Sequence, residues 1–283
     1  MAMGFGCNAA GIVGCRIIDS PRERLIAILT NNFVPCNGRF PTLIAIITMF
    51  FVGNLTGIGQ SVVSTVLLTG VIVLGVIMTF AVSSALSATV LKGMPSSFTL
   101  ELPPYRRPQI GRVIVSSILD RTLFVLGRAV AVAAPAGIVI WLMANCNVGG
   151  ISLLNHCTGF LDPFAKLIGL DGVILMAFIL GFPANEIVIP IMIMAYLNTG
   201  AILEIDNMLE LRQLLVNNGW TWLTALCTML FSLMHWPCST TCLTIKKETG
   251  SLKWTAASVL IPTAVGMLIC FLVAGTARIF GLV

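Results

Sequence analysis

The chain has 283 residues, of which 57% are hydrophobic and only 10% are charged, and its mean hydropathy is +1.00. Soluble domains carry about 25% charged residues, so this composition excludes a soluble globular protein and predicts an all-α, polytopic membrane protein. The formal net charge of +5 is expected to reflect membrane topology, because basic residues concentrate in cytoplasmic loops, and no nucleic-acid partner is expected.

The first part of the chain is expected to contain two short helices and two longer apolar segments. Residues 7–15 predict a short helix of small residues, and Ser20, followed by a proline and by Glu23, is typical of the start of a second helix. A first span is expected at residues 40–52. The apolar stretch at residues 62–91 is longer than one upright crossing requires, so we expect it to tilt or to protrude from the bilayer.

Residues 92–128 are the main polar segment, and their excess of basic residues predicts a cytoplasmic location. Within this segment, the motif ELPPYR at residues 101–106 contains two consecutive prolines and is expected to form an extended tether on the membrane surface. The remaining pattern predicts spans at residues 129–144, 220–235 and 254–280, and external loops at residues 146–171 and 198–219.

One apolar stretch, at residues 172–203, is interrupted in its middle. It contains a single charged residue, Glu186, between two apolar halves that are separated by the sequence GFP at residues 181–183. The sequence leaves two topologies open for it. The stretch either enters and returns on one side of the membrane, or it crosses the membrane twice in short pieces.

A pentapeptide pattern, Gly-Phe-x-x-Asn, occurs twice in the chain, as GFGCN at residues 4–8 and as GFPAN at residues 181–185. Each copy is followed by a Pro-Cys pair, which ends at Cys36 in the first half and at Cys238 in the second half. Duplicated polar motifs that break apolar helices are typical of transporters with internal repeats, whose broken helices place ligands near the middle of the bilayer.

Glu186 is the first candidate for a functional residue. A carboxylate at the centre of a membrane helix costs about 2.5–3.5 kcal/mol on insertion scales, so it should face a cavity or a partner. It could bind a cation or accept a proton in a permeation path. The alternative is local, because Asn185 could cap the following helix and Glu186 would then complement the helix dipole in its first turn.

Cysteine, asparagine and hydroxyl side chains form a second group of candidates. The thiols of Cys36 and Cys238 suit iron, zinc or copper, although buried cysteines often serve only as small hydrophobic residues. His235 with Cys238 and Cys242 would place three metal-binding side chains close together. The remaining candidates, each ambiguous between metal ligand and helix cap, are Asn8, Asn185, Ser239, Thr240 and Thr241.

Several motifs are missing from the sequence. It has no phosphate-binding loop of the Gly-x-x-x-x-Gly-Lys-Ser/Thr type, no zinc-protease motif and no Gly-x-Ser-x-Gly element, and it has only two histidines. We therefore expect no enzymatic activity and no resident cofactor. Cys146 and Cys157 fall in an expected external loop, and whether they form a disulfide is left open.

At these motifs the sequence resembles the membrane domain of ferrous iron transport protein B. The matching segments are GFGCN (4–8), PRERLIAIL (21–29), FVPCNGRFP (33–41), ELPPYRRP (101–108), GFPANEIVIP (181–190) and WPCSTTCLTIKKETGSLKWT (236–255). The resemblance implies two gate-type repeats with broken or re-entrant helices. The first would occupy residues 1–91, the second residues 129–283, and residues 92–128 would form the tether and an amphipathic helix between them.

The resemblance also implies a function, namely the transport of ferrous iron across the bacterial inner membrane by a multi-pass protein. Its gate motifs imply a metal path with three groups of residues, which are Cys36 with Cys7 and Asn8, Asn185 with Glu186, and Cys238 with Ser239 and Thr240.

The chain departs from the family pattern in two places. Family members begin with a GTP-binding domain and further spans, whereas this sequence starts at the first motif, and Ala9-Ala10 replaces the usual Val-Pro after Asn8. We expect the permease part of a split or truncated transporter, with a separate GTPase acting in trans and the chain forming a homo-oligomer. The alternatives are a gate-fold transporter of an organic solute such as a nucleoside, or a membrane scaffold subunit that transports nothing.

Overall fold

The structure is a computed structural model, and it describes residues 2–53, 57–93, 109, 111, 114–115, 123–202, 205 and 207–281. The predicted tether at residues 101–108 lies outside the described residues, as does most of the polar segment around it. Everything that follows concerns the described part of the chain.

The first half of the chain consists of short helices followed by one long helix. Its elements are η1 (Ala2–Phe5), α1 (Asn8–Gly14), η2 (Cys15–Ile17), α2 (Pro21–Thr30), η3 (Asn31–Phe33), η4 (Asn37–Arg39), α3 (Phe40–Ile46), the π-helical turn η5 (Ile47–Phe51) and α4 (Ile58–Ala88). The predicted start of α2 is confirmed, because the Ser20 hydroxyl accepts a hydrogen bond of 3.4 Å from the backbone N–H of Glu23.

The second half is also helical, apart from one hairpin of two-residue strands. Its elements are α6 (Phe124–Asn145), β1 (Asn147–Val148), β2 (Ile151–Ser152), α7 (Leu153–Leu167), α8 (Gly172–Leu180), η7 (Asn185–Ile187), α9 (Val188–Leu197), α10 (Met208–Asn217), α11 (Trp222–Met234), α12 (Ser239–Thr249) and α13 (Leu252–Ile279). The strands pair antiparallel, with Asn147 opposite Ser152.

Three helical segments in the described residues are long and apolar enough to cross a membrane, namely Pro21–Phe51, α4 and α13. The pair α7 and α8 passes the same test together but is bent by 111° at the break between its helices. The predicted all-α membrane fold with broken or re-entrant helices is therefore confirmed. The long apolar stretches expected at residues 62–91 and 254–280 correspond to α4 and α13.

The loop expected at residues 146–171 is wrong, because the segment contains the β-hairpin and α7. Its expected external location stays a prediction. The Ser152 hydroxyl caps this helix by accepting a hydrogen bond of 3.3 Å from the N–H of Asn155. Leu154, Thr158 and Ala165 are buried on one face, so α7 is held by packing despite the proline inside it.

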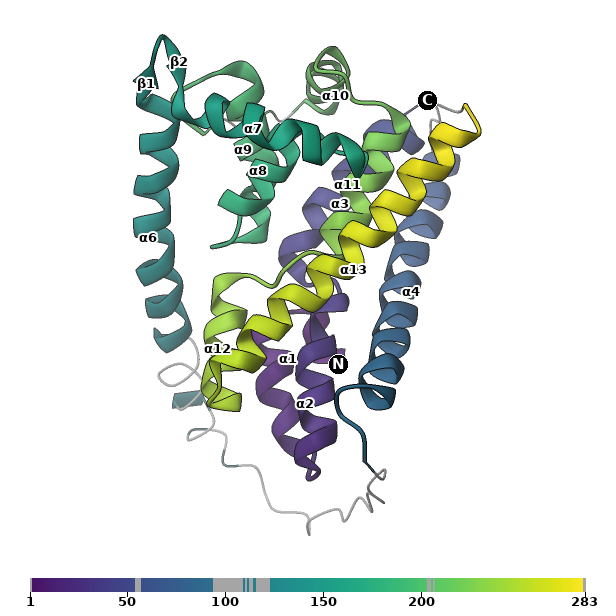
Figure 1. Cartoon of the computed structure of the whole chain (residues 1–283), viewed down its shortest axis with the longest axis vertical. Coiled ribbons are helices and arrows are strands. Elements are labelled where there is room, and N and C mark those ends of the chain that lie inside the picture. The colour runs from purple at the N-terminus through teal and green to yellow at the C-terminus, as the bar shows by residue number, and fades with distance from the viewer. Residues whose placement is uncertain are drawn as a thin grey trace.

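Of the two topologies left open for residues 172–203, the structure contains the re-entrant one. In Figure 1, α8 runs from α7 at the upper end toward the middle of the molecule, and α9 runs back to the same end. The nine residues of α8 are about 14 Å long at 1.5 Å per residue, which is about half of a 30 Å hydrocarbon core. The GFPAN motif thus lies at the turn of a half-membrane hairpin.

The two halves of the chain run in opposite directions. In Figure 1, the GFGCN motif leads through α1 toward the lower end, whereas the GFPAN motif leads through α9 toward the upper end. The broken segment α2–α3 likewise rises through the molecule, and the broken segment α11–α12 descends. Opposite directions of paired broken helices are typical of transporters with inverted repeats.

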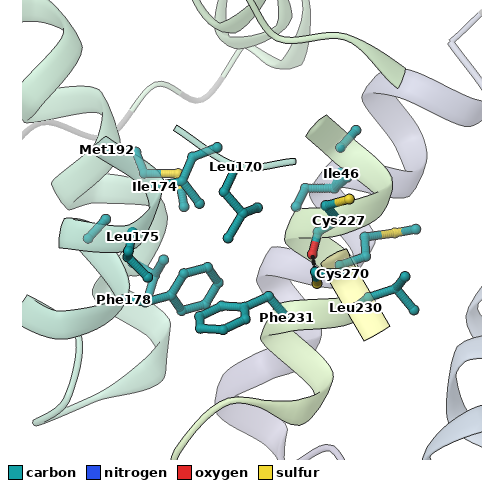
Figure 2. Packing of buried hydrophobic residues seen from close by; sticks show 14 of the residues in the cluster. Ile46, Leu170, Ile174, Leu175, Phe178, Met192, Cys227, Leu230, Phe231 and Cys270 are labelled. Carbon is teal, nitrogen blue, oxygen red and sulfur yellow. Dashed lines mark hydrogen bonds between the residues drawn. The ribbon is translucent and has the colours of Figure 1, made fainter. Parts of the chain in front are cut away.

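The apolar core lies where α8 meets α11. Figure 2 shows Phe178 of α8 against Phe231 of α11, and their ring centroids are 5.1 Å apart with an interplanar angle of 75°. Cys227 and Cys270 are fully buried between α11 and α13, where the Cys270 thiol donates a hydrogen bond to the carbonyl of Cys227. Both cysteines therefore act as packing residues.

One glycine allows the long helix α4 to approach the first helix break. A Cβ atom on Gly75 would lie 2.6 Å from the carbonyl oxygen of Phe33 and 3.3 Å from Leu233, whereas a Cβ on Gly70 of the same helix would meet nothing within 4 Å. We expect Gly75→Ala to destabilise the protein by about 1–3 kcal/mol through overpacking. Thermal unfolding of the detergent-purified protein measures this loss.

Gly70→Ala is the matched control, because it makes the same change in the same helix in open space. It should unfold at the temperature of the unmodified protein or slightly above it, since alanine favours the helix over glycine. Equal unfolding temperatures for the two variants would contradict the close approach of α4.

Candidate metal path at the helix breaks

The two helix breaks are built alike at the level of the backbone. The residue after each Pro-Cys pair donates its N–H to a carbonyl of the motif in its own half. Asn37 donates to Gly6 over 3.3 Å, and Ser239 donates to Phe182 over 2.9 Å. Each half therefore contains one motif bound to one break, which is the structural counterpart of the sequence repeat.

Arg39 connects the two halves. Its side chain is 1% exposed, and its Nη1 donates to the carbonyls of Asn32 at 2.9 Å and Leu233 at 2.8 Å. Its Nη2 donates to the Asn32 Oδ1 at 3.1 Å and to the carbonyls of His235 at 3.4 Å and Trp236 at 3.3 Å. The carbonyls at the end of a helix lack partners within it and carry partial negative charge. A guanidinium of the first half thus caps α11 of the second half.

No carboxylate pairs with Arg39 among the described residues. Their ion pairs join Arg16 to Glu248 and Lys166 to Asp162, both away from the helix breaks. The charge of Arg39 is therefore balanced by carbonyl and amide dipoles. Ionisable residues buried in a membrane are expensive and mark functional regions, so this guanidinium is a feature of the site as well as of the fold.

Three side chains from three segments meet beside Arg39. Cys36 precedes η4, Asn185 begins η7 and His235 follows α11, and their exposed fractions are 9%, 8% and 1%. The Asn185 Nδ2 donates to the Cys36 sulfur over 3.8 Å, and the Asn185 Oδ1 lies 3.4 Å from the His235 Nε2. The Asn185 amide therefore bridges the breaks of the two halves.

Asn8 occupies the corresponding place in the first motif. It is buried, and its Nδ2 donates to the Asn32 Oδ1 over 3.4 Å; with the amide turned over, the nitrogen donates instead to the carbonyls of Gly4 at 3.1 Å and Val34 at 3.3 Å. The Asn31 side chain also donates to the Asn8 carbonyl, over 3.1 Å. Asn8 thus fixes the first motif against the first break.

The capping alternative for the two motif asparagines is wrong. Cys7 occupies the cap position of α1 and Ala184 that of η7, and neither position has a side-chain capping bond. The side chains of Asn8 and Asn185 point across to the breaks instead, where they bind the groups described above.

The other candidates lie around this cluster with different exposure. Glu186 is exposed on η7, beside Asn185, and its carboxylate makes no hydrogen bond or ion pair among the described residues. Cys7 is exposed at the start of α1. The Ser239 hydroxyl is buried and donates to the Pro183 carbonyl over 3.4 Å, and Thr240 is half-buried in the first turn of α12.

The expected grouping of His235, Cys238 and Cys242 is wrong. In the described part of the chain, no three histidine, cysteine, aspartate or glutamate side chains gather as a metal site. The break at Pro237 separates them, because Cys238 lies 3.2 Å from the Thr241 hydroxyl and Cys242 faces the Pro237 carbonyl. His235 points to Asn185 instead. Cys146 and Cys157 are both free, so they form no disulfide.

Sequence reasoning missed Arg39 and Asn32. Both lie within or beside a quoted motif, and the available signal was a basic residue inside a segment that crosses the membrane. Their partners are backbone carbonyls about 200 positions away, for which no side-chain pattern exists.

Comparison with known proteins agrees with the motifs. A model of the ferrous iron transport protein B C terminus matches residues 68–120, and the Gate model, described as nucleoside recognition, matches residues 126–252. The chain is 31% identical over 290 residues to the Fe(2+) transporter FeoB of Staphylococcus aureus strain COL, covering 99% of this chain and 40% of the relative. The resemblance to ferrous iron transport protein B is confirmed.

More distant Fe(2+) transporters FeoB show the same extent of similarity. The protein of Methanocaldococcus jannaschii is 26% identical over 99% of this chain and 41% of its own length. The protein of Campylobacter jejuni is 24% identical over 98% of this chain and 45% of its own length. The chain thus spans less than half the length of these curated FeoB relatives, and no solved structure matches it.

Replacement of Arg39 tests its role as the link between the halves. Arg39→Met keeps the length of the side chain but leaves the carbonyls at the end of α11 buried without donors, which should cost about 3 kcal/mol or more. Arg39→Lys keeps the charge and some of the hydrogen bonds, so it should lower the stability of the protein less than Arg39→Met does. Thermal unfolding in detergent ranks the variants.

Arg24→Met is the control, because Arg24 is half-buried and donates only to the nearby carbonyls of Ile18 and Asp19 among the described groups. Its unfolding temperature should change little. If Arg39→Met is as stable as this control, the guanidinium does not hold the halves together.

Proposed function

We propose that the chain is the permease part of a ferrous iron transporter, a multi-pass protein of the bacterial inner membrane rather than an enzyme. The observation that carries the proposal is the contact between Cys36 and Asn185, in which a thiol of one half meets an amide of the other half at the helix breaks. Similarity to Fe(2+) transporters FeoB over nearly the whole chain supports the same function.

The ligand types suit ferrous iron. Magnesium and calcium prefer sites made of oxygen alone, whereas sulfur favours borderline and softer metals. Cys36 and Cys238 would supply sulfur along the path, and the amide of Asn185 would supply oxygen. Asn8 would hold the first motif in place, and Ser239 and Thr240 would offer hydroxyl oxygens beyond the second break.

Glu186 and Cys7 would act on the exposed side of the cluster. Both are exposed, whereas their neighbours Asn185 and Asn8 are buried, so each would meet the ion before the enclosed cluster does. A carboxylate at the mouth of a low-dielectric path raises the local concentration of cations. Glu186 would therefore attract cations, and the buried cluster behind Glu186 would select ferrous iron among them.

The buried charge of Arg39 would limit how tightly the ion binds. An ion in a transport path must bind well enough to enter and weakly enough to leave. A fixed positive charge that binds the carbonyl of His235 lies close to the proposed path and opposes a second cation there. Arg39 would thus favour release of the ion over storage.

Different segments of the chain would have different roles in transport. Residues 1–91 and 129–283 would form the two gate-type repeats, and the basic segment 92–128 would receive a GTP-binding partner on the cytoplasmic side. That partner would supply the energy or the control of transport, and the chain would assemble as a homo-oligomer in the lipid bilayer. No resident cofactor is needed, since Fe2+ is the cargo.

Transport can be measured as uptake of radiolabelled ferrous iron into proteoliposomes under reducing conditions. We expect Cys36→Ser and Glu186→Gln each to reduce uptake by about tenfold or more, equivalent to about 1.4 kcal/mol in the barrier. Cys146→Ser is the control, because this thiol is exposed beside the β-hairpin and away from the breaks. Uptake in the control should equal that of the unmodified chain.

Uptake that survives both site variants would overturn the proposed path. Absence of uptake by the unmodified chain would count against the proposal that it forms the permease part of the transporter. Insensitivity to thiol-blocking reagents, together with uptake of an organic solute, would indicate the related solute transporter instead.

A further inference from the structure

We infer that His235 is the nitrogen ligand of a buried transition-metal site, which it forms with the side-chain oxygen of Asn185 beside the Cys36 thiol. This inference rests on the proposed function of the same cluster and adds to it the residue that distinguishes between divalent cations. No part of the proposed path so far assigns a role to this histidine, although it is 1% exposed at the junction of the two halves.

The hydrogen bonds of the imidazole fix its tautomer. The Nδ1 atom lies 2.9 Å from the Ser232 carbonyl and 3.2 Å from the Phe231 carbonyl, and both partners can only accept. Nδ1 therefore carries the proton, and the Nε2 lone pair is free. A histidine that binds a metal usually donates its other ring N–H to a carboxylate or a backbone carbonyl in this way.

In one orientation of the Asn185 amide, the Nε2 lone pair faces the Oδ1 atom over 3.4 Å. No hydrogen atom then lies between these two acceptors, because Nδ1 carries the proton. A divalent cation would satisfy both atoms. Two ligands that are each about 2.1 Å from a tetrahedral ion lie about 3.4 Å apart, which is the separation found here.

The amide also explains how the cluster remains satisfied without an ion. If the Asn185 amide turns over, its nitrogen donates to the His235 Nε2 and its oxygen accepts from the Cys36 thiol, which lies on the other side of the amide. The contact of 3.8 Å to the sulfur and the contact of 3.4 Å to the imidazole accommodate both orientations. Rotation of one amide thus moves the oxygen ligand from the nitrogen side to the sulfur side.

Aromatic rings surround the imidazole on its other sides. The ring centroid of His235 lies 4.8 Å from that of Phe178, 5.7 Å from that of Trp236 and 5.9 Å from that of Phe231. Such an apolar wall excludes water, so an ion at Nε2 must exchange part of its hydration shell for the protein ligands. Imidazole suits iron, zinc, copper and nickel, whereas magnesium and calcium prefer oxygen. His235 therefore selects against magnesium and calcium at this point.

Cobalt(II) is a suitable probe, because its absorption bands report ligand type and geometry. We would titrate Co2+ into the purified full chain under reducing conditions, and record X-ray absorption of the bound metal. His235→Gln should weaken Co2+ binding by about tenfold or more and remove the imidazole scattering. His156→Gln is the matched control, since that histidine is exposed on α7 and bonds the Val148 carbonyl.

A second variant distinguishes loss of a metal ligand from loss of folding. Asn185→Asp places an anionic oxygen beside the Nε2 atom, so it should tighten Co2+ binding by about tenfold and keep the imidazole signal. Unchanged Co2+ affinity and spectra in His235→Gln, or no gain in Asn185→Asp, would overturn the inference. Either of these results would leave the proposed transport function unaffected, provided that Cys36→Ser still reduces iron uptake. Loss of that dependence would overturn the transport path whatever the Co2+ data show.

Discussion

The hydrogen bonds from Arg39 to the carbonyl end of α11 are the contacts on which the rest of the structure depends. A broken helix exposes backbone carbonyls where the bilayer offers no water to hydrogen-bond to them. The break is therefore stable only when another group of the protein donates hydrogen bonds to these carbonyls. The first half supplies the group, and the second half supplies the helix end. Neither half can therefore complete its midplane structure alone.

This constraint explains why polar residues gather at the breaks. Asn32 donates to the His235 carbonyl over 2.6 Å, and the buried Asn8 holds the first motif against the first break. Once these groups have satisfied the backbone, the remaining atoms of Asn185, Cys36 and His235 would be available for the proposed ion. Structural hydrogen bonding and metal coordination would then use different polar atoms of the same site.

The fold could be predicted from the sequence wherever the signal is local. Apolar length identified α4 and α13, and the Ser20 cap identified the start of α2. The duplicated motifs located the breaks and most of the candidate residues. The partners of Arg39 could not be predicted, since they are backbone atoms distant in sequence. The direction of the His235 side chain could not be predicted either, because it depends on contacts with backbone carbonyls of α11 and with Asn185.

The bonding of each break to its own motif has a consequence for motion. Asn37 and Ser239 tie their breaks within their own halves, and Asn185 and His235 belong to the same half, whereas Cys36 belongs to the other. Displacement of one half against the other would have to break the hydrogen bonds of Arg39, and it would separate the sulfur from a nitrogen–oxygen pair that stays intact. During alternating access the ion would then pass from a sulfur ligand to a nitrogen–oxygen pair, or the reverse. Each displacement would therefore change whether the ion is bound by softer or harder ligand atoms.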